Sequence, residues 1–163
     1  MKAKEITRQA DLGFRKGHSA RRGWLLKRRW TGTPCSCVDA GLNMPSTPSC
    51  PLCYGVGFRC GYYYPMACVW ADLDPVKLRA ERDDQQLRGS VVTKDSDGLM
   101  LGGCLASSAD LWVCANTDDR FFLDQVSPDM EVRGIPITLR VRMRLVPFTS
   151  IVYTIPVPDA REP

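Results

Sequence analysis

The chain has 163 residues, of which 44% are apolar and 25% charged, and its net charge is +4. This length suits one ordinary domain or two very small ones and excludes a large multidomain enzyme, while the apolar content excludes a chain that is disordered throughout. No run approaches the roughly 20 apolar residues of a membrane helix, and the first residues lack the apolar core of a secretory signal, so we expect a protein that folds in a reducing cytoplasm.

Residues 1–30 carry most of the positive charge. They hold ten Lys or Arg and two acids, a net charge of +8, against −4 for the rest of the chain. Because polar residues and glycines dominate this stretch, we predict an extended basic arm that binds nucleic acid or an acidic protein, or that is simply a solvated tail. The candidate partner-binding residues are Arg21, Arg22, Trp24, Arg28, Arg29 and Trp30.

Residues 31–70 contain two close pairs of cysteines. Cys35 and Cys37 are separated by one residue, and Cys50 and Cys53 by two. Four thiolates so arranged can bind one tetrahedral metal ion, and zinc is the expected cofactor. The alternatives are reduced core thiols, a disulfide formed after release, or an iron–sulfur centre. The other cysteines show no such pairing: Cys60, Cys68, Cys104 and Cys114.

Two further features belong to this predicted zinc module. The spacer 38–49 has no apolar period, so it is predicted to be an exposed loop whose two ends the metal ties together. Tyrosines gather at 61–66, with Trp70 nearby. We expect these aromatic rings to pack over the module, although they could instead stack on bases or fill a protein interface.

Residues 71–89 are predicted to be a linker, in which Asp74 and Pro75 favour the start of a short helix over 76–87. From residue 90 the apolar period changes to two, and strands 91–94 and 99–101 are predicted to flank a hairpin turn at 95–98. A calcium loop at this turn is rejected because a leucine and an alanine occupy ligand positions.

The remaining sequence predicts further strands at 111–114, 120–126, 137–146 and 151–157, before a short tail at 159–163. In the strand 137–146 one face is apolar and the other carries three arginines, Arg140, Arg142 and Arg144. These arginines are either dispersed among acids of neighbouring strands or kept for an external anionic partner. Several short strands without helices between them predict a mainly β fold, a small β-barrel or sandwich over 90–158.

Several strings in this sequence resemble tailed-bacteriophage virion proteins that carry a four-cysteine module ahead of a β-barrel similar to head–tail connector, or stopper, proteins. The strings are Trp24 to Asp39, Cys50 to Phe58 with Gly61-Tyr62-Tyr63, Asp119 to Phe122, Val132 to Pro136, and Tyr153 to Val157. The resemblance implies a structural metal site at the four paired cysteines and no catalytic residue.

The resemblance also implies a place in the virion neck. The partners would be the portal or adjacent neck and tail proteins, within a homo-oligomeric ring such as a hexamer or dodecamer, with DNA a candidate contact in the channel. We expect no membrane and no small-molecule substrate. The alternatives are a nucleic-acid-binding zinc module, or a baseplate or other tail structural protein.

An enzyme is not expected. The single histidine, His18, lies in the basic arm, and the sequence contains no Ser-His-Asp set, His-Glu-x-x-His string or phosphate-binding loop. A zinc ion bound by four thiolates also leaves no open position for a substrate.

Overall fold

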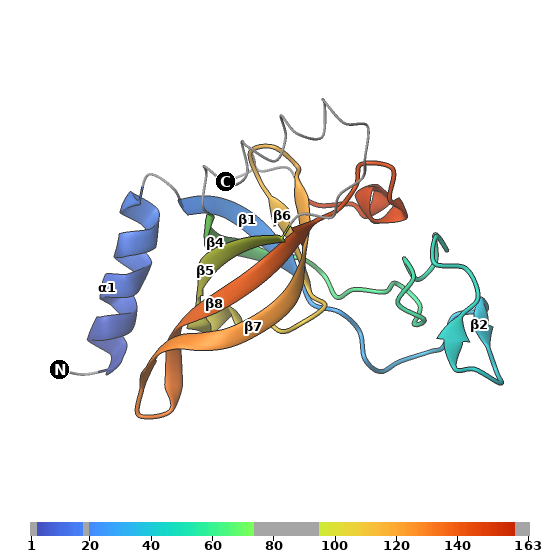
Figure 1. Cartoon of the computed structure of the whole chain (residues 1–163), viewed down its shortest axis with the longest axis horizontal. Helices are drawn as coiled ribbons and strands as arrows, with labels where there is room; N and C mark the ends of the chain where they lie inside the picture. The colour runs from blue at the N-terminus through green and yellow to red at the C-terminus, as the bar shows by residue number, and fades with distance from the viewer. Residues whose placement is uncertain (1–2, 18–19, 74–94, 159–163) are drawn as a thin grey trace.

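A computed structural model describes residues 3–17, 20–73 and 95–158, and its centre is a closed, antiparallel six-stranded barrel (Figure 1). Around the barrel the strands follow the order β1-β4-β5-β8-β7-β6, and β6 pairs with β1 to close it. The barrel strands are β1 (Ala20–Leu26), β4 (Met66–Leu73), β5 (Asp95–Leu101), β6 (Leu111–Cys114), β7 (Arg120–Val132) and β8 (Ile135–Leu145). The prediction of a mainly β fold is therefore confirmed, in its barrel form.

The barrel is not confined to residues 90–158, because β1 and β4 come from earlier in the chain and pair with each other. The four-cysteine segment lies between them, so it is an insertion between neighbouring barrel strands and does not precede the barrel. It contains a small two-stranded sheet made of β2 (Val38–Asp39) and β3 (Met44–Pro45). We call residues 31–65 the cysteine module.

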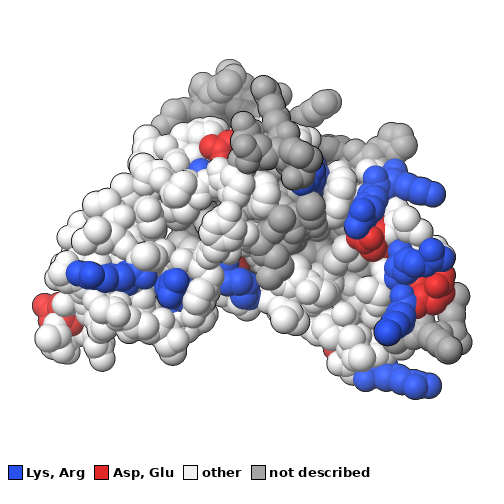
Figure 2. Space-filling model, turned by 180° about the vertical axis from the view of Figure 1, so that it is seen from behind, with Lys and Arg blue, Asp and Glu red and all other residues white. Residues whose placement is uncertain are grey.

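The first 30 residues do not form an extended arm. Ala3–Lys16 is a helix, α1, and the following described residues enter β1. Ile6, Ala10 and Phe14 are spaced four residues apart, and this spacing gives the helix one apolar face. Charged residues dominate the segment and obscure this spacing. Ion pairs between Arg8 and Glu5 and between Arg15 and Asp11 offset part of the charge. At the helix end of the molecule, basic and acidic side chains lie side by side (Figure 2).

The turn predicted at residues 95–98 is wrong, because these residues belong to β5. Asp95 and Asp97 lie opposite Arg144 and Arg142 of β8. The backbone ladder to β8 and the cross-strand ion pair between Asp97 and Arg142 outweigh the local turn preference of the Asp-Ser-Asp-Gly string. The predicted strand 91–94 and the predicted helix 76–87 lie outside the described residues.

The arginines of β8 are dispersed among acids from the neighbouring strands, as one of the two alternatives predicted. Arg142 pairs with Asp97 of β5 at 3.3 Å. Arg140 and Arg144 pair with acids of β7, Asp129 at 2.8 Å and Asp124 at 3.1 Å. The other face of β8 points into the core, so the predicted alternation of this strand is confirmed.

The strand predicted at 151–157 is also wrong, since Ile151–Thr154 forms a 3-10 helix, η2. The buried guanidinium of Arg120 donates to the carbonyl oxygens of Val152 and Ile155 and lies over the ring of Tyr153. These carbonyl groups therefore find a side-chain partner in place of a neighbouring strand. A second 3-10 turn, η1 (Gly102–Cys104), follows β5.

Two apolar clusters hold the molecule together. The first fills the barrel interior, where the ring centroids of Trp112 and Phe121 lie 5.7 Å apart. The second lies outside the barrel and joins Val56 and Tyr62 of the cysteine module to Leu26. Burying each such large side chain stabilises the fold by about 1.5–3 kcal/mol. The module is thus docked on the barrel at its base.

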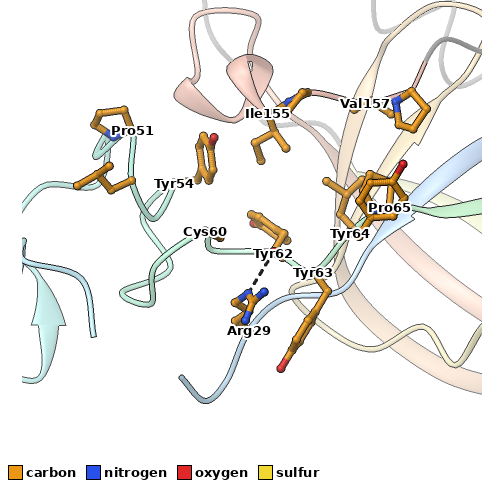
Figure 3. Close-up of a pocket in the computed structure, with 14 residues that line it drawn as sticks. Arg29, Pro51, Tyr54, Cys60, Tyr62, Tyr63, Tyr64, Pro65, Ile155 and Val157 are labelled. Carbon is orange, nitrogen blue, oxygen red and sulfur yellow. Dashed lines mark hydrogen bonds between the residues drawn. The ribbon is translucent and has the colours of Figure 1, made fainter. Parts of the chain in front are cut away.

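A groove with a volume of about 720 Å³ opens beside the second cluster, between the cysteine module and residues 155–158 (Figure 3). No helix in the described part of the chain has the length and hydropathy needed to span a membrane.

Candidate metal centre

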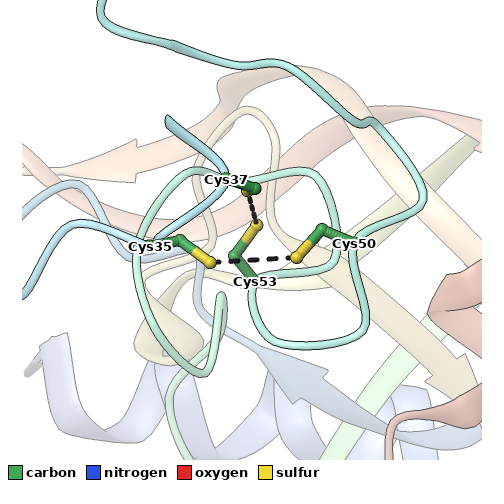
Figure 4. Close-up of side chains that lie close together, drawn as sticks. All are labelled: Cys35, Cys37, Cys50 and Cys53. Carbon is green, nitrogen blue, oxygen red and sulfur yellow. Dashed lines mark hydrogen bonds between the residues drawn. The ribbon is translucent and has the colours of Figure 1, made fainter. Parts of the chain in front are cut away.

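The four paired cysteines point toward one common centre, although they come from two separate loops (Figure 4). The sulfurs of Cys35 and Cys50 are 3.8 Å apart, and those of Cys37 and Cys53 are 3.5 Å apart. All four sulfurs lie within 4.8 Å of one another. The cysteines therefore cluster closely enough to bind one metal ion.

Backbone turns bring the two pairs together. The amide of Val38 donates to the carbonyl of Cys35 at 3.0 Å, and that of Tyr54 to Cys50 at 2.8 Å. A third bond, from the Cys35 amide to the carbonyl of Gly57 at 2.9 Å, fastens the first turn beside the second. The local sequence thus presents four sulfurs to one point with the backbone already hydrogen-bonded.

The site is buried but has almost no apolar core of its own. Cys35, Cys50 and Cys53 are buried and Cys37 is partly buried, and the described apolar neighbour of this cluster is Val38. The apolar contacts of the module lie at its base, in the second cluster, so the part around the four thiols has little hydrophobic stabilisation of its own. A bound ion would supply the missing stabilisation.

The environment already favours ionisation of one ligand. The backbone amide of Leu52 donates to the Cys50 sulfur and lowers the pKa of this thiol to about 7, although burial acts in the opposite direction. Loss of solvation and the neighbouring thiols, that of Cys53 first, raise the pKa of Cys37. Because thiolates are the metal-binding form, the lowered pKa of Cys50 favours metal binding by this thiol, whereas the raised pKa of Cys37 opposes it.

The spacer between the two pairs is exposed, as predicted. The Asp39 carboxylate accepts hydrogen bonds from the amides of Gly41 and Leu42, at 2.7 and 3.2 Å, and so orders the tip. Leu42 and Met44 are exposed there. Cys60 is exposed and lies outside the four-sulfur cluster.

The predicted partner-binding residues occupy two places. Arg21, Arg22 and Trp24 lie on β1, half-buried, with Trp24 packed against the second apolar cluster. Arg28 and Trp30 lie together beyond the end of β1, with the guanidinium 4.6 Å from the ring centroid.

Arg29 makes a similar contact, 4.3 Å from the ring of Tyr63. Of the predicted aromatic cluster, Tyr62 is buried against the barrel, whereas Tyr64 is 84% exposed.

Sequence reasoning missed an ion pair at the base of the module, between Lys27 and Asp110. These residues are far apart in the chain, and no local pattern marks either of them. A comparison with known protein families finds no match, and no curated protein matches the sequence.

Proposed function

We propose that this chain is a structural subunit of a tailed-phage virion, seated in the neck between portal and tail, and that its four paired cysteines hold one zinc ion. The role is assembly and not catalysis. The observation that carries this proposal is a closed barrel with a sulfur-clamped module inserted between two adjacent strands. The module, α1 and the β7–β8 hairpin project from the barrel and supply surfaces for neighbours (Figure 1).

Sulfur geometry supports zinc as the metal. A tetrahedral ion with Zn–S bonds of about 2.3 Å places its sulfurs about 3.8 Å apart, close to the two pair distances in this site. In a multi-iron cluster the four cysteines are shared among different irons, so some of their sulfurs would lie farther apart than the 4.8 Å within which all four lie here. A structural zinc ion with four thiolates also leaves no open coordination position, in keeping with a role without chemistry.

Elemental analysis of freshly purified, reduced protein tests the metal. We expect about one zinc per chain, lost in Cys53→Ser and retained in Cys60→Ser, the matched control at an exposed cysteine outside the cluster. Absence of metal from the unaltered protein, or equal metal content in the two variants, would contradict the zinc site.

The neck location is tested on intact particles. The chain would form a closed ring, a hexamer or dodecamer, against the portal or an adjacent neck or tail protein, and assemble only on the preceding layer. Gold-labelled antibodies against the purified protein should mark the head–tail junction in electron micrographs. Labelling at the distal end of the tail would favour the baseplate alternative, and unlabelled particles would refute a virion role.

Nucleic-acid binding is the second candidate function. Arg28 and Arg29 lie against aromatic rings, and no described residue forms a salt bridge with either of them. Figure 2 shows a row of basic side chains on the module side of the molecule. Such a surface can bind phosphates and stack bases.

DNA affinity that falls with salt would support this function, provided that Arg28→Gln with Arg29→Gln weakens it. The matched control is Arg140→Gln with Arg142→Gln, because acids already pair with those arginines. Equal effects of the two double variants would leave only nonspecific charge attraction and contradict a dedicated surface.

A further inference from the structure

The groove beside the cysteine module has three walls of different origin (Figure 3). Pro51, Leu52 and Tyr54 come from the turn that carries Cys50 and Cys53. Tyr62 and Leu26 lie at its base and belong to the second apolar cluster. Residues 155–158, which contain two prolines, complete the opposite side together with Tyr64 and Pro65.

The lining is aromatic and apolar with one charge. Tyrosines and prolines dominate it, and among the described residues Arg29 is the single charged side chain that lines the groove. The Arg29 guanidinium lies over the Tyr63 ring, and its Nε donates to the carbonyl oxygen of Tyr62 at 3.3 Å. These contacts hold Arg29 at the rim, where its remaining N–H groups can bind a carboxylate.

We propose that this groove binds an extended, proline-containing acidic segment of a partner protein. Proline-rich segments adopt the polyproline II conformation in advance and dock in aromatic-lined grooves with little loss of conformational entropy. An acidic residue in the segment would pair with Arg29, which no described carboxylate of this chain neutralises. The highly exposed ring of Tyr64 gives the segment an apolar surface on which to pack.

Metal binding and docking are linked in this arrangement. Leu52 lies between Cys50 and Cys53, so the turn that forms one wall of the groove also presents two of the four sulfurs. The Leu52 carbonyl accepts a hydrogen bond from the Cys60 amide at 2.8 Å, which helps to fix this turn. Loss of the metal should therefore dismantle that wall. This dependence rests on the proposed zinc site, whereas the chemistry of the groove does not.

Fluorescence anisotropy with labelled synthetic peptides tests the proposal on the full zinc-loaded chain. The probe is a peptide of about 12 residues built from a Pro-Pro-Glu repeat, and the comparison peptides of equal length replace Glu by Lys or Pro-Pro by Gly-Ser. We expect the first peptide to bind with a Kd below about 1 mM and the other two at least about tenfold more weakly.

Variants locate the binding. Tyr64→Ser and Arg29→Gln should each weaken binding about tenfold, whereas Ile135→Ser, an exposed apolar position on the β7–β8 hairpin, should leave it unchanged. Removal of zinc with a chelator should abolish binding, and returned zinc should restore it.

The proposal is overturned if the Pro-Pro-Glu peptide does not bind, if all three peptides bind equally, or if both groove variants bind normally. Binding that survives zinc removal overturns the metal dependence alone. Zinc content and particle labelling are measured separately, so a groove without affinity in a zinc-loaded, particle-bound protein leaves the proposed function intact.

Discussion

At the scale of single residues, Asp110 joins parts of the chain that lie far apart in sequence. Its carboxylate is fully buried and accepts hydrogen bonds from Lys27 Nζ at 2.5 Å, the Arg28 amide at 2.9 Å and the Ser107 amide at 2.8 Å. Lys27 also donates to the carbonyl of Leu105 at 2.6 Å. The contacts fasten the point where β1 ends and the chain leaves for the cysteine module.

Asp110→Asn is expected to lower the free energy of unfolding by about 3 kcal/mol, because it leaves a largely buried ammonium group without its counter-charge. Asp97→Asn is the control, since Asp97 and Arg142 are both half exposed and their pair should contribute less than about 1 kcal/mol. Urea denaturation measures both. Equal losses in the two variants would contradict the role assigned to Asp110.

Gly61 is a second residue on which the module depends. Its φ is +51°, and a Cβ at this position would collide with the carbonyl oxygen of Cys53. Gly134, in the tight turn of the β7–β8 hairpin, also has a positive φ, +75°, but open space surrounds its Cβ position. A comparison of alanine substitutions at the two glycines therefore separates the effect of backbone strain from the effect of a steric collision.

We expect Gly61→Ala to destabilise the module by about 3 kcal/mol or more and to reduce its zinc content, because strain and collision add. Gly134→Ala should cost about 1 kcal/mol and leave zinc content unchanged. Thermal melts and elemental analysis measure these effects. Normal zinc content in Gly61→Ala protein would show that the turn after Cys53 tolerates a side chain.

At the scale of elements, the barrel and the cysteine module differ in what stabilises them. The barrel has a continuous apolar interior and a closed ladder of strands. Beyond its base, the module has the four-cysteine cluster and the short β2–β3 pair. With the proposed zinc ion bound, stability in such a small unit would come chiefly from the metal.

Removal of zinc by a chelator should therefore unfold the module and spare the barrel. Hydrogen exchange followed by mass spectrometry should show lost protection in residues 31–61 and retained protection in β5, β7 and β8, with Trp112 still buried. Cooperative loss of protection in all strands would mean that the metal stabilises the whole fold. Unchanged protection in the module would mean that the metal stabilises neither the module nor the barrel.

At the scale of the whole molecule, projections extend from opposite ends of the barrel. The helix α1 and the β7–β8 hairpin lie at one end and the cysteine module at the other (Figure 1). In the proposed ring, one of these surfaces would meet a lateral neighbour and another would meet the next layer. β1 begins at Ala20, so α1 can be removed without deleting a barrel strand.

Deletion of residues 1–17 should leave zinc content and the barrel circular dichroism unchanged but abolish incorporation into particles, because α1 would supply an anchoring contact to an acidic neighbour. Particles assembled with the truncated chain and probed with antibody measure this. Normal incorporation would show that the helix has no anchoring role, and this result would not bear on the proposed zinc site.

Several features were readable from the sequence because their signals are local. The spacing of Cys35, Cys37, Cys50 and Cys53 predicted the sulfur cluster, since short turns alone bring each pair to one point. Alternation over residues 137–146 predicted β8, because a half-buried strand repeats every two residues. The helix α1 had a local signal too, in Ile6, Ala10 and Phe14, which its charge obscured.

Only the tertiary structure decided how these pieces combine. Residues 95–98 form a strand because they pair with β8, where Arg142 lies opposite Asp97. Residues 151–154 form a 3-10 helix that Arg120 fastens through the carbonyl groups of Val152 and Ile155. Pairing of β1 with β4 makes the cysteine module an insertion in the barrel. Each outcome depends on a partner distant in sequence, and a local pattern carries no information about which distant segment will supply it.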